Sequence, residues 1–187
     1  MAGGLNVVYP SNPYDAKGLM AAALESEDPV IFFEPVLQYF ERAEGVPVDH
    51  YTLPIGKAKV VREGTDLTIV TYGNLVHTAI QAADTLAEEG VSVELIDLRT
   101  LRPWDEATVL ASVAKTGRLV VGHEAPLSSG FGAEVVATVA EKAGDLLETP
   151  PARVAHADTI WAPAKLEPYS IIDPARIVAA VRRVMED

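Results

Sequence analysis

Residues 67–95 read LTIVTYGNLVHTAIQAADTLAEEGVSVEL, and this stretch decides the fold class. Leu67–Tyr72 is a short apolar run, which is typical of a strand buried on both faces. Apolar residues then recur at helical spacing over 76–87, and Gly90 stands where such a helix would end. Over 91–95 apolar and polar residues alternate, as in a strand. The order strand, helix, strand predicts one unit of a parallel sheet.

The same alternation continues on both sides of this unit. We expect the following elements: a strand over Lys59–Arg62 paired with Leu67–Tyr72 across the turn 63–66, a helix opened by Pro103-Trp104-Asp105 and closed by Gly117, a strand over Arg118–Gly122, a helix over Ala133–Leu147, a strand over Ala152–Ala155, and a last helix capped by Asp173-Pro174. This pattern predicts a three-layer α/β/α domain with a mostly parallel sheet and one antiparallel edge.

A smaller strand–helix–strand unit precedes this domain. Leu5–Val8 and Val30–Phe33 are its expected strands, and Asn12-Pro13 is a strong helix start because Asn caps and Pro suits the first helical position. The unit is too small to bury its own faces, so its sheet neighbours must lie elsewhere. Residues 41–56 contain Pro and Gly at irregular intervals and are expected to form a linker.

Composition excludes several functional classes. The chain has 187 residues, with 15 Lys+Arg against 27 Asp+Glu, a net charge of −12 and no cysteine. This charge disfavours nucleic acid and anionic membranes as partners, since both are bound by clustered Lys and Arg. Without cysteine there is no disulfide, thiol nucleophile or Cys-ligated metal. No apolar run is long enough to span a membrane and no signal segment is visible, so we expect a cytoplasmic location.

The segment from Gly122 to Gly132, GHEAPLSSGFG, carries the candidate chemistry of the second domain. It leaves the carboxyl end of an expected strand and enters a helix, where open α/β sheets tend to bind ligands. His123 and Glu124 form a candidate acid–base pair. The alternative is a packing and turn motif with a hydrogen-bonded histidine. The GFG at its end is only a fragment of a dinucleotide fingerprint.

Other polar and aromatic residues favour structural roles. Asp97, Arg99 and Arg102 crowd one strand end, where an anion site is possible but an ion pair is the better interpretation. Metal-ligand spacing is absent among His50, His77 and His156. The hydrolase elbow is absent around Ser128 and Ser129. Core or interface positions are the better interpretation for Trp104, Trp161 and Phe131. The residues alone therefore give no complete active site.

Several long segments resemble one family, the beta subunit of the thiamine-diphosphate-dependent 2-oxo acid dehydrogenase decarboxylating component. They are 7–35, 51–73, 93–105 and 112–126, beginning VVYPSNPYDAKG, YTLPIGKAKVV, VELIDLRTLRPWD and SVAKTGRLVVGHEAP. Three short motifs resemble the branched-chain type more than the pyruvate type: Phe32-Phe33-Glu34-Pro35, Pro103-Trp104-Asp105 and His123-Glu124-Ala125-Pro126.

The resemblance implies a domain organisation. Residues 1–40 resemble the end of the family's pyrimidine-binding domain, 41–55 the linker, and 56–187 the whole transketolase-type C-terminal domain. The family's catalytic glutamate and histidine correspond to positions upstream of Val7. We therefore expect no catalytic or cofactor-binding residue in this chain, and no activity from the chain alone. The full enzyme would use thiamine diphosphate and magnesium to decarboxylate a 2-oxo acid and acylate lipoyl-lysine.

A potassium site is also implied by the resemblance. In the family a monovalent-cation loop uses a backbone carbonyl, then Asp, then Asn, and here Ala23, Ser26 and Asp28 occupy those positions. Oxygen ligands of this kind suit hard cations. Ser and Asp replace the family's Asp and Asn, so the ligand set departs from the pattern.

The expected partners follow from the same family. They are the alpha subunit, a second beta subunit and the basic subunit-binding domain of the acyltransferase core, which an acidic chain would attract. Two alternatives stay open. One is a free-standing acidic interaction module that binds a basic partner without catalysis. The other is an unrelated small-ligand enzyme that uses His123 and Glu124.

Overall fold

Strands and helices alternate along most of the chain in the computed structural model, which describes residues 4–39 and 45–186. The strands are β1 (Asn6–Val8), β2 (Val30–Phe32), β3 (Lys59–Arg62), β4 (Leu67–Thr71), β5 (Val93–Asp97), β6 (Thr100–Arg102), β7 (Leu119–Pro126) and β8 (Ala152–His156). The helices are α1 (Pro13–Glu25), α2 (Leu75–Glu88), α3 (Glu106–Thr116), α4 (Phe131–Ala143), α5 (Glu167–Ser170) and α6 (Pro174–Glu186), with short 3₁₀ turns at Val36–Gln38 and Gly144–Leu146.

The larger sheet has five strands in the order β3-β5-β4-β7-β8. Strands β5, β4, β7 and β8 run parallel to one another. Strand β3 forms the edge beside β5 and is antiparallel to it. Every residue of β4 and β5 is buried, as expected for central strands of a parallel sheet covered on both faces. The mostly parallel sheet and its antiparallel edge confirm the predicted fold class.

The predicted pairing of 59–62 with 67–72 is wrong. Strand β3 pairs with β5, and both edges of β4 are taken by the parallel strands β5 and β7. The turn between β3 and β4 is bound to the chain before β5: the amides of Thr65 and Asp66 donate to the carbonyl of Ser92. The turn residues between β3 and β4 predict only that the chain reverses. They do not show that β5 lies between these two strands in the sheet.

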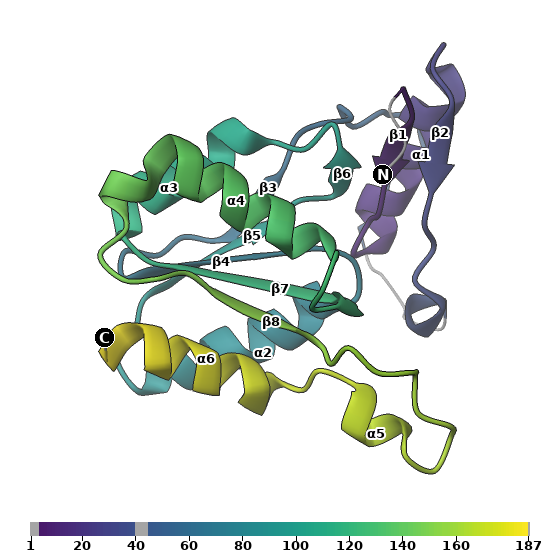
Figure 1. Cartoon of the computed structure of the whole chain (residues 1–187). Helices are drawn as coiled ribbons and strands as arrows, with labels where there is room; N and C mark the ends of the chain where they lie inside the picture. The colour runs from purple at the N-terminus through teal and green to yellow at the C-terminus, as the bar shows by residue number, and fades with distance from the viewer. Residues whose placement is uncertain (1–3, 40–44, 187) are drawn as a thin grey trace.

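Two helical layers cover the sheet. Helices α2 and α6 lie on one face and α3 and α4 on the other (Figure 1). Two separate clusters of buried side chains result: one includes Leu86 of α2 and Val181 of α6, and the other includes Val109 of α3 and Val135 of α4. Among the described residues no helix is long and apolar enough to cross a membrane.

Local signals set several helix ends as predicted. The side chain of Asn12 accepts a hydrogen bond from the amide of Asp15, and Pro13 is the first residue of α1. Asp105 caps α3 in the same way through the amide of Thr108. Gly117 ends α3 in a left-handed conformation with φ of 67°, where glycine has no steric penalty.

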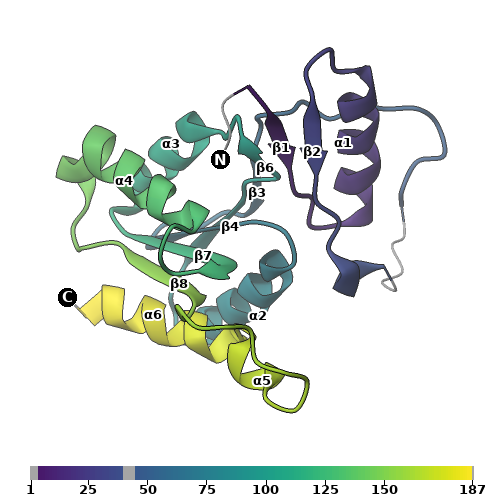
Figure 2. The same cartoon turned by 45° about the vertical axis from the view of Figure 1, so that its right-hand side comes forward.

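The first strand–helix–strand unit finds a neighbour in the second domain. Strand β1 pairs in parallel with β2 and antiparallel with β6, which gives a second sheet in the order β2-β1-β6 (Figure 2). The sequence did not predict β6, because it is only three residues long and directly follows β5. It pairs with one edge of the unit and is thus a sheet neighbour from elsewhere in the chain, as the sequence requires.

The opposite edge of this unit keeps its apolar side chains exposed. Val8 and Leu19 are fully buried, but Leu24 is 81% exposed and Phe33 is 46% exposed. The described part of β2 has no second sheet neighbour. Apolar side chains are therefore exposed beside β2, whereas those that pack behind β1 are buried.

Some element ends differ from prediction, and one helix is additional. Strand β7 continues four residues further, to Pro126, because its end pairs with His156 in β8. Helix α4 ends at Ala143, where a 3₁₀ turn replaces its last residues. Helix α5 was not predicted, since its four residues are too few to show a period. The linker expected over 41–55 lies partly outside the described residues.

Candidate functional site

The two sheets meet at a junction that contains two adjoining hollows. One, of about 550 Å³, we call the acidic pocket, and the other, of about 540 Å³, the tyrosine pocket. Leu5, Leu101 and Phe131 line both, so they form the wall between them. Each hollow is large enough for a small ligand or a side chain of a partner.

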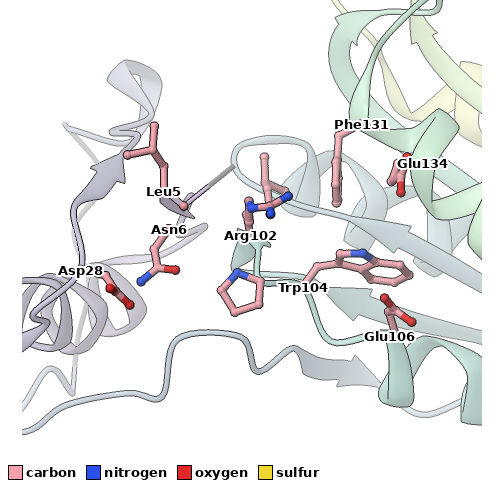
Figure 3. Close-up of a pocket in the computed structure, with 11 residues that line it drawn as sticks. Leu5, Asn6, Asp28, Arg102, Trp104, Glu106, Phe131 and Glu134 are labelled. Carbon is pink, nitrogen blue, oxygen red and sulfur yellow. The ribbon is translucent and has the colours of Figure 1, made fainter. Parts of the chain in front are cut away.

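The acidic pocket places carboxylates around two aromatic rings. Trp104 and Phe131 contact each other edge to face, with ring centroids 6.2 Å apart. Asp28 faces them from the first unit, while Glu106 and Glu134 come from the starts of α3 and α4 (Figure 3). Carboxylates beside exposed π faces suit a cationic group such as a Lys or Arg side chain.

The tyrosine pocket surrounds one carboxylate with phenols. Hydrogen bonds from Asn74 and Tyr9 stabilise the charged form of Glu124, yet burial outweighs them and raises its pKa. Tyr9 has a raised pKa because of burial and the nearby Glu124. Burial is also the main cause of the raised pKa of Tyr72. The sequence did not point to Tyr9, Tyr72 and Asn74, although Tyr9 directly follows a predicted strand, Tyr72 ends one and Asn74 comes two residues later.

His123 and Glu124 are brought together in β7, but only Glu124 lines the tyrosine pocket. His123 is fully buried, and its Nδ1 donates to the carbonyl of Ala125 at 3.1 Å. Its Nε2 has no hydrogen-bond partner among the described residues. Burial lowers the pKa of His123, so the ring is neutral at pH 7.

The glycines of the GFG segment explain why the His123 ring is held in place. A Cβ on Gly130 would lie 2.4 Å from Cε1 of His123, and a Cβ on Gly132 would lie 2.3 Å from Cδ2. The backbone at the start of α4 therefore packs directly on the ring. This geometry supports the packing interpretation of the GFG segment and leaves Glu124 as the candidate for chemistry.

A buried polar cluster, which we call the Asp97 cluster, joins the first unit to the second domain. The Ser11 hydroxyl and the Arg99 amide both donate to Asp97 at the end of β5. Arg99 also forms a bidentate ion pair with Asp15 of α1, at 3.0 and 2.6 Å. The predicted ion pair is thus present, but its acid comes from the first unit. Arg102 is exposed and lines the acidic pocket.

Burial raises the pKa of Asp97 to about 6, which gives a pH-dependent prediction. The folded chain binds the proton on the Asp97 carboxyl more tightly than the unfolded chain does. The stabilisation that results is therefore fully present below pH 4 and is lost as the pH rises through 6. Asp97→Asn removes this titration. In urea titrations, the free energy of unfolding of this variant relative to the wild type should therefore be about 2–3 kcal/mol higher at pH 7.5 than at pH 4. A difference that stays constant over this pH range contradicts the assignment.

The three residues of the expected potassium site lie together at the end of α1. Ala23 belongs to the last turn of that helix, whose carbonyls have no helical partner and carry the negative end of the dipole. Ser26 Oγ accepts the Asp28 amide at 3.1 Å, and the Asp28 carboxylate lines the acidic pocket. The potassium site stays a prediction. Among the described residues no group of three or more His, Asp or Glu side chains could hold a metal ion.

The other candidates of the sequence analysis take separate structural positions. His50 pairs with Glu25 at 2.9 Å, and His77 Nε2 lies 2.6 Å from the Ser11 carbonyl. His156 stacks on Trp161 with ring centroids 5.1 Å apart. The Ser128 hydroxyl donates to Asp158 at 2.6 Å. None of these contacts forms a nucleophile–base pair.

The fold and the sequence together define the class of this protein. Residues 56–177 match the family model described as "Transketolase, C-terminal domain". The chain therefore belongs to the transketolase C-terminal domain family. A solved structure, "Split gene transketolase, inactive beta4 tetramer", shares the fold with a TM-score of 0.78 and 24% identity over 98% of this chain and 58% of its own.

More specific relatives are beta subunits of 2-oxo acid dehydrogenases. The chain is 45% identical over 183 residues to "2-oxoisovalerate dehydrogenase subunit beta, mitochondrial" of Dictyostelium discoideum, covering 97% of this chain and 49% of the relative. It is 44% identical over 183 residues to "Pyruvate dehydrogenase E1 component subunit beta" of Bacillus subtilis (strain 168), covering 98% and 56%. The chain spans about half the length of the curated relatives it matches.

Proposed function

We propose that this chain is the C-terminal part of a 2-oxo acid dehydrogenase beta subunit. The observation that carries the proposal is identity of 44–46% with such subunits over 97–98% of the chain, including both the first unit and the second domain. In the proposed full enzyme, thiamine diphosphate and magnesium supply the decarboxylation of a 2-oxo acid, and the acyl group passes to lipoyl-lysine.

The role of these residues within that enzyme is structural. They would serve the pairing of alpha and beta subunits and the docking of the basic domain of the acyltransferase core. The acidic charge of the chain supports this docking, because complementary potentials speed encounter and orient the partner.

The proposed substrate of the full enzyme is a branched-chain 2-oxo acid. Its support is the sequence of three motifs around Phe32–Pro35, Pro103–Asp105 and His123–Pro126, whereas the overall identities to the two types are nearly equal. The full enzyme should therefore decarboxylate 2-oxoisovalerate with a higher kcat/KM than pyruvate. The reverse order would show that these motifs do not report the substrate.

The acidic pocket favours a second candidate function, a free-standing module that binds a basic partner without catalysis. Asp28 and Glu134 line the pocket from its two sides, with Arg102 and Trp104 between them, and the excess of carboxylates would hold a cationic side chain of a peptide (Figure 3). The two functions place the basic partner differently: near the C-terminus in the first, and at the junction of the two sheets in the second.

Charge reversal discriminates between the two functions. We expect Glu186→Lys, at an exposed site near the C-terminus, to weaken binding of the basic subunit-binding domain several-fold and to flatten its salt dependence. Glu134→Lys should leave that binding unchanged. Affinities measured by surface plasmon resonance at several salt concentrations test this, with Glu27→Lys in the first unit as the control. Loss in Glu134→Lys alone would support the second function instead.

A further inference from the structure

A basic hollow lies between β8 and α6, beside the edge of the larger sheet. We call it the arginine hollow. It has a volume of about 440 Å³ and is lined by three arginines, Arg153 of β8 and Arg176 and Arg183 of α6. Val154, Ala155 and Ala180 give it an apolar wall. It thus combines positive charge and apolar surface in a chain whose net charge is −12.

Two of the three guanidinium groups are fixed by the backbone. Nη1 of Arg153 donates to the carbonyl of Leu127 at 2.7 Å, and Nη2 of Arg176 donates to the carbonyl of Ala155 at 2.8 Å. Both side chains are half-buried. A guanidinium has five N–H donors, so each of these two groups is oriented by the backbone and keeps further donors for a ligand.

The arginines of the hollow lack the carboxylate partners that other arginines of this chain have. Arg62, Arg99, Arg118 and Arg182 each form an ion pair, the last of these with Glu89. Among the described residues, no such ion pair is formed by Arg153, Arg176 or Arg183. Three cationic side chains that line one hollow favour the binding of an anion, which relieves their mutual repulsion.

The carboxylates beside the hollow are engaged elsewhere. Asp158 accepts hydrogen bonds from the amide and hydroxyl of Ser128, which hold its pKa below the usual range, with smaller contributions from Arg153 and His156. Asp173 accepts the backbone amide of Arg176 at the start of α6. Asp158 therefore ties the loop after β8 to Ser128, and Asp173 holds the start of α6, so neither forms an ion pair with the arginines within the described residues.

The surroundings indicate the size and shape of that anion. The volume falls within the range of small-molecule sites. A second hollow of about 400 Å³ shares His156 and Arg176 with the first and is lined by the apolar side chains of Ile160 and Leu166. A ligand whose charged group lies among the arginines could therefore place an apolar or ring-shaped body against Val154, Ala155 and Ala180, with further apolar surface beyond it.

We propose that the arginine hollow binds a small organic phosphate, with a phosphate monoester group held by Arg153, Arg176 and Arg183 and an apolar or ring-shaped body against Val154, Ala155 and Ala180. A dianion matches several converging guanidinium groups better than a monocarboxylate, because each fork can donate to a different oxygen. This site is independent of the assignment to a dehydrogenase.

Phenyl phosphate is the probe for calorimetric titration of the full chain. The wild type should bind it saturably below about 1 mM, more tightly than inorganic phosphate, which lacks the ring. Arg183→Gln should weaken the affinity about fivefold or more. The side chain of Arg183 is exposed and holds no backbone group, so this variant tests binding without removing a structural hydrogen bond.

Arg182→Gln is the matched control, since Arg182 is the adjacent residue on α6 but pairs with Glu89 and does not line the hollow. Its affinity for phenyl phosphate should stay within about twofold of the wild type. Equal losses in both variants, or no saturable binding up to about 10 mM, would overturn the proposal. It would also be overturned if Arg183→Gln changed self-association in sedimentation while leaving phenyl phosphate binding unchanged.

Discussion

Arg99→Ala is expected to destabilise the chain by about 3–5 kcal/mol, because it leaves the buried Asp15 carboxylate without its charge partner. Asp15 is fully buried in α1, and the Arg99 side chain is only 12% exposed. The loss would be a large share of the stability of a typical domain. Since this pair joins α1 to the end of β5, the first unit should separate from the second domain at lower denaturant than in the wild type.

Urea unfolding followed by circular dichroism measures the free energy, and amide exchange over α1 and α2 locates the loss. Exchange should increase in α1 more than in α2. Arg102→Ala is the matched control: its side chain is exposed, and we expect a change within about 0.5 kcal/mol. A loss below about 1 kcal/mol for Arg99→Ala would mean that the ion pair does not hold the junction together.

Gly132→Ala is expected to cost about 3 kcal/mol, because the added Cβ would lie 2.3 Å from Cδ2 and 2.6 Å from Nε2 of His123. The ring cannot easily move away, since Gly130 packs on its other edge and its Nδ1 is bonded to Ala125. Either the start of α4 or the end of β7 must shift. The tyrosine pocket, which both elements line, should widen as a result.

Thermal and urea unfolding of Gly132→Ala measure this cost, and Gly144→Ala is the control. Gly144 has an ordinary helical φ of −62°, and nothing lies within 4 Å of its added Cβ, so we expect a neutral effect or a gain of up to about 1 kcal/mol. Combining Gly132→Ala with His123→Ala should cost less than the sum of the two single changes. Additive costs would show that the ring and the glycine do not contact each other.

The sequence predicted the layers of the fold well because their signals are local. Helix α2 has an apolar face at helical spacing, and Asn12, Asp105 and Gly117 act at the helix ends where each was expected. The pairing of β3 with β5 is a long-range contact that depends on where the turn before β4 packs. No local pattern reports such a contact, so the hairpin prediction failed.

The candidate site was only partly visible in the sequence for the same reason. The sequence predicted His123 and Glu124 as one candidate pair. Their different roles depend on residues from other elements: Gly130 and Gly132 pack on His123, and Tyr9 bonds to Glu124. The ion pair of Arg99 was expected with its sequence neighbour Asp97, whereas the structure supplies Asp15 from 84 positions away. Charge proximity in sequence is therefore a weak guide to the partner of a buried cation.

The exposed edge of β2 and the shared junction of the two sheets support the view that this chain works as part of a larger assembly. Phe33, Val36 and Leu37 are large apolar residues left exposed beside β2. Exposed clusters of this kind mark protein interfaces in soluble proteins. In the proposed enzyme they would be covered by the preceding half of the beta subunit.

Functional replacement in a related enzyme tests the central claim most directly. The measurement is the rate of 2-oxo acid decarboxylation by a chimera that joins this chain to the preceding half of the beta subunit from Bacillus subtilis, co-expressed with the alpha subunit of that enzyme. We expect the chimera to assemble with the alpha subunit and to show decarboxylase activity above background, and this chain with the alpha subunit alone to show no activity. A folded chimera that neither assembles nor decarboxylates, or activity from this chain without the preceding half, would contradict the central claim.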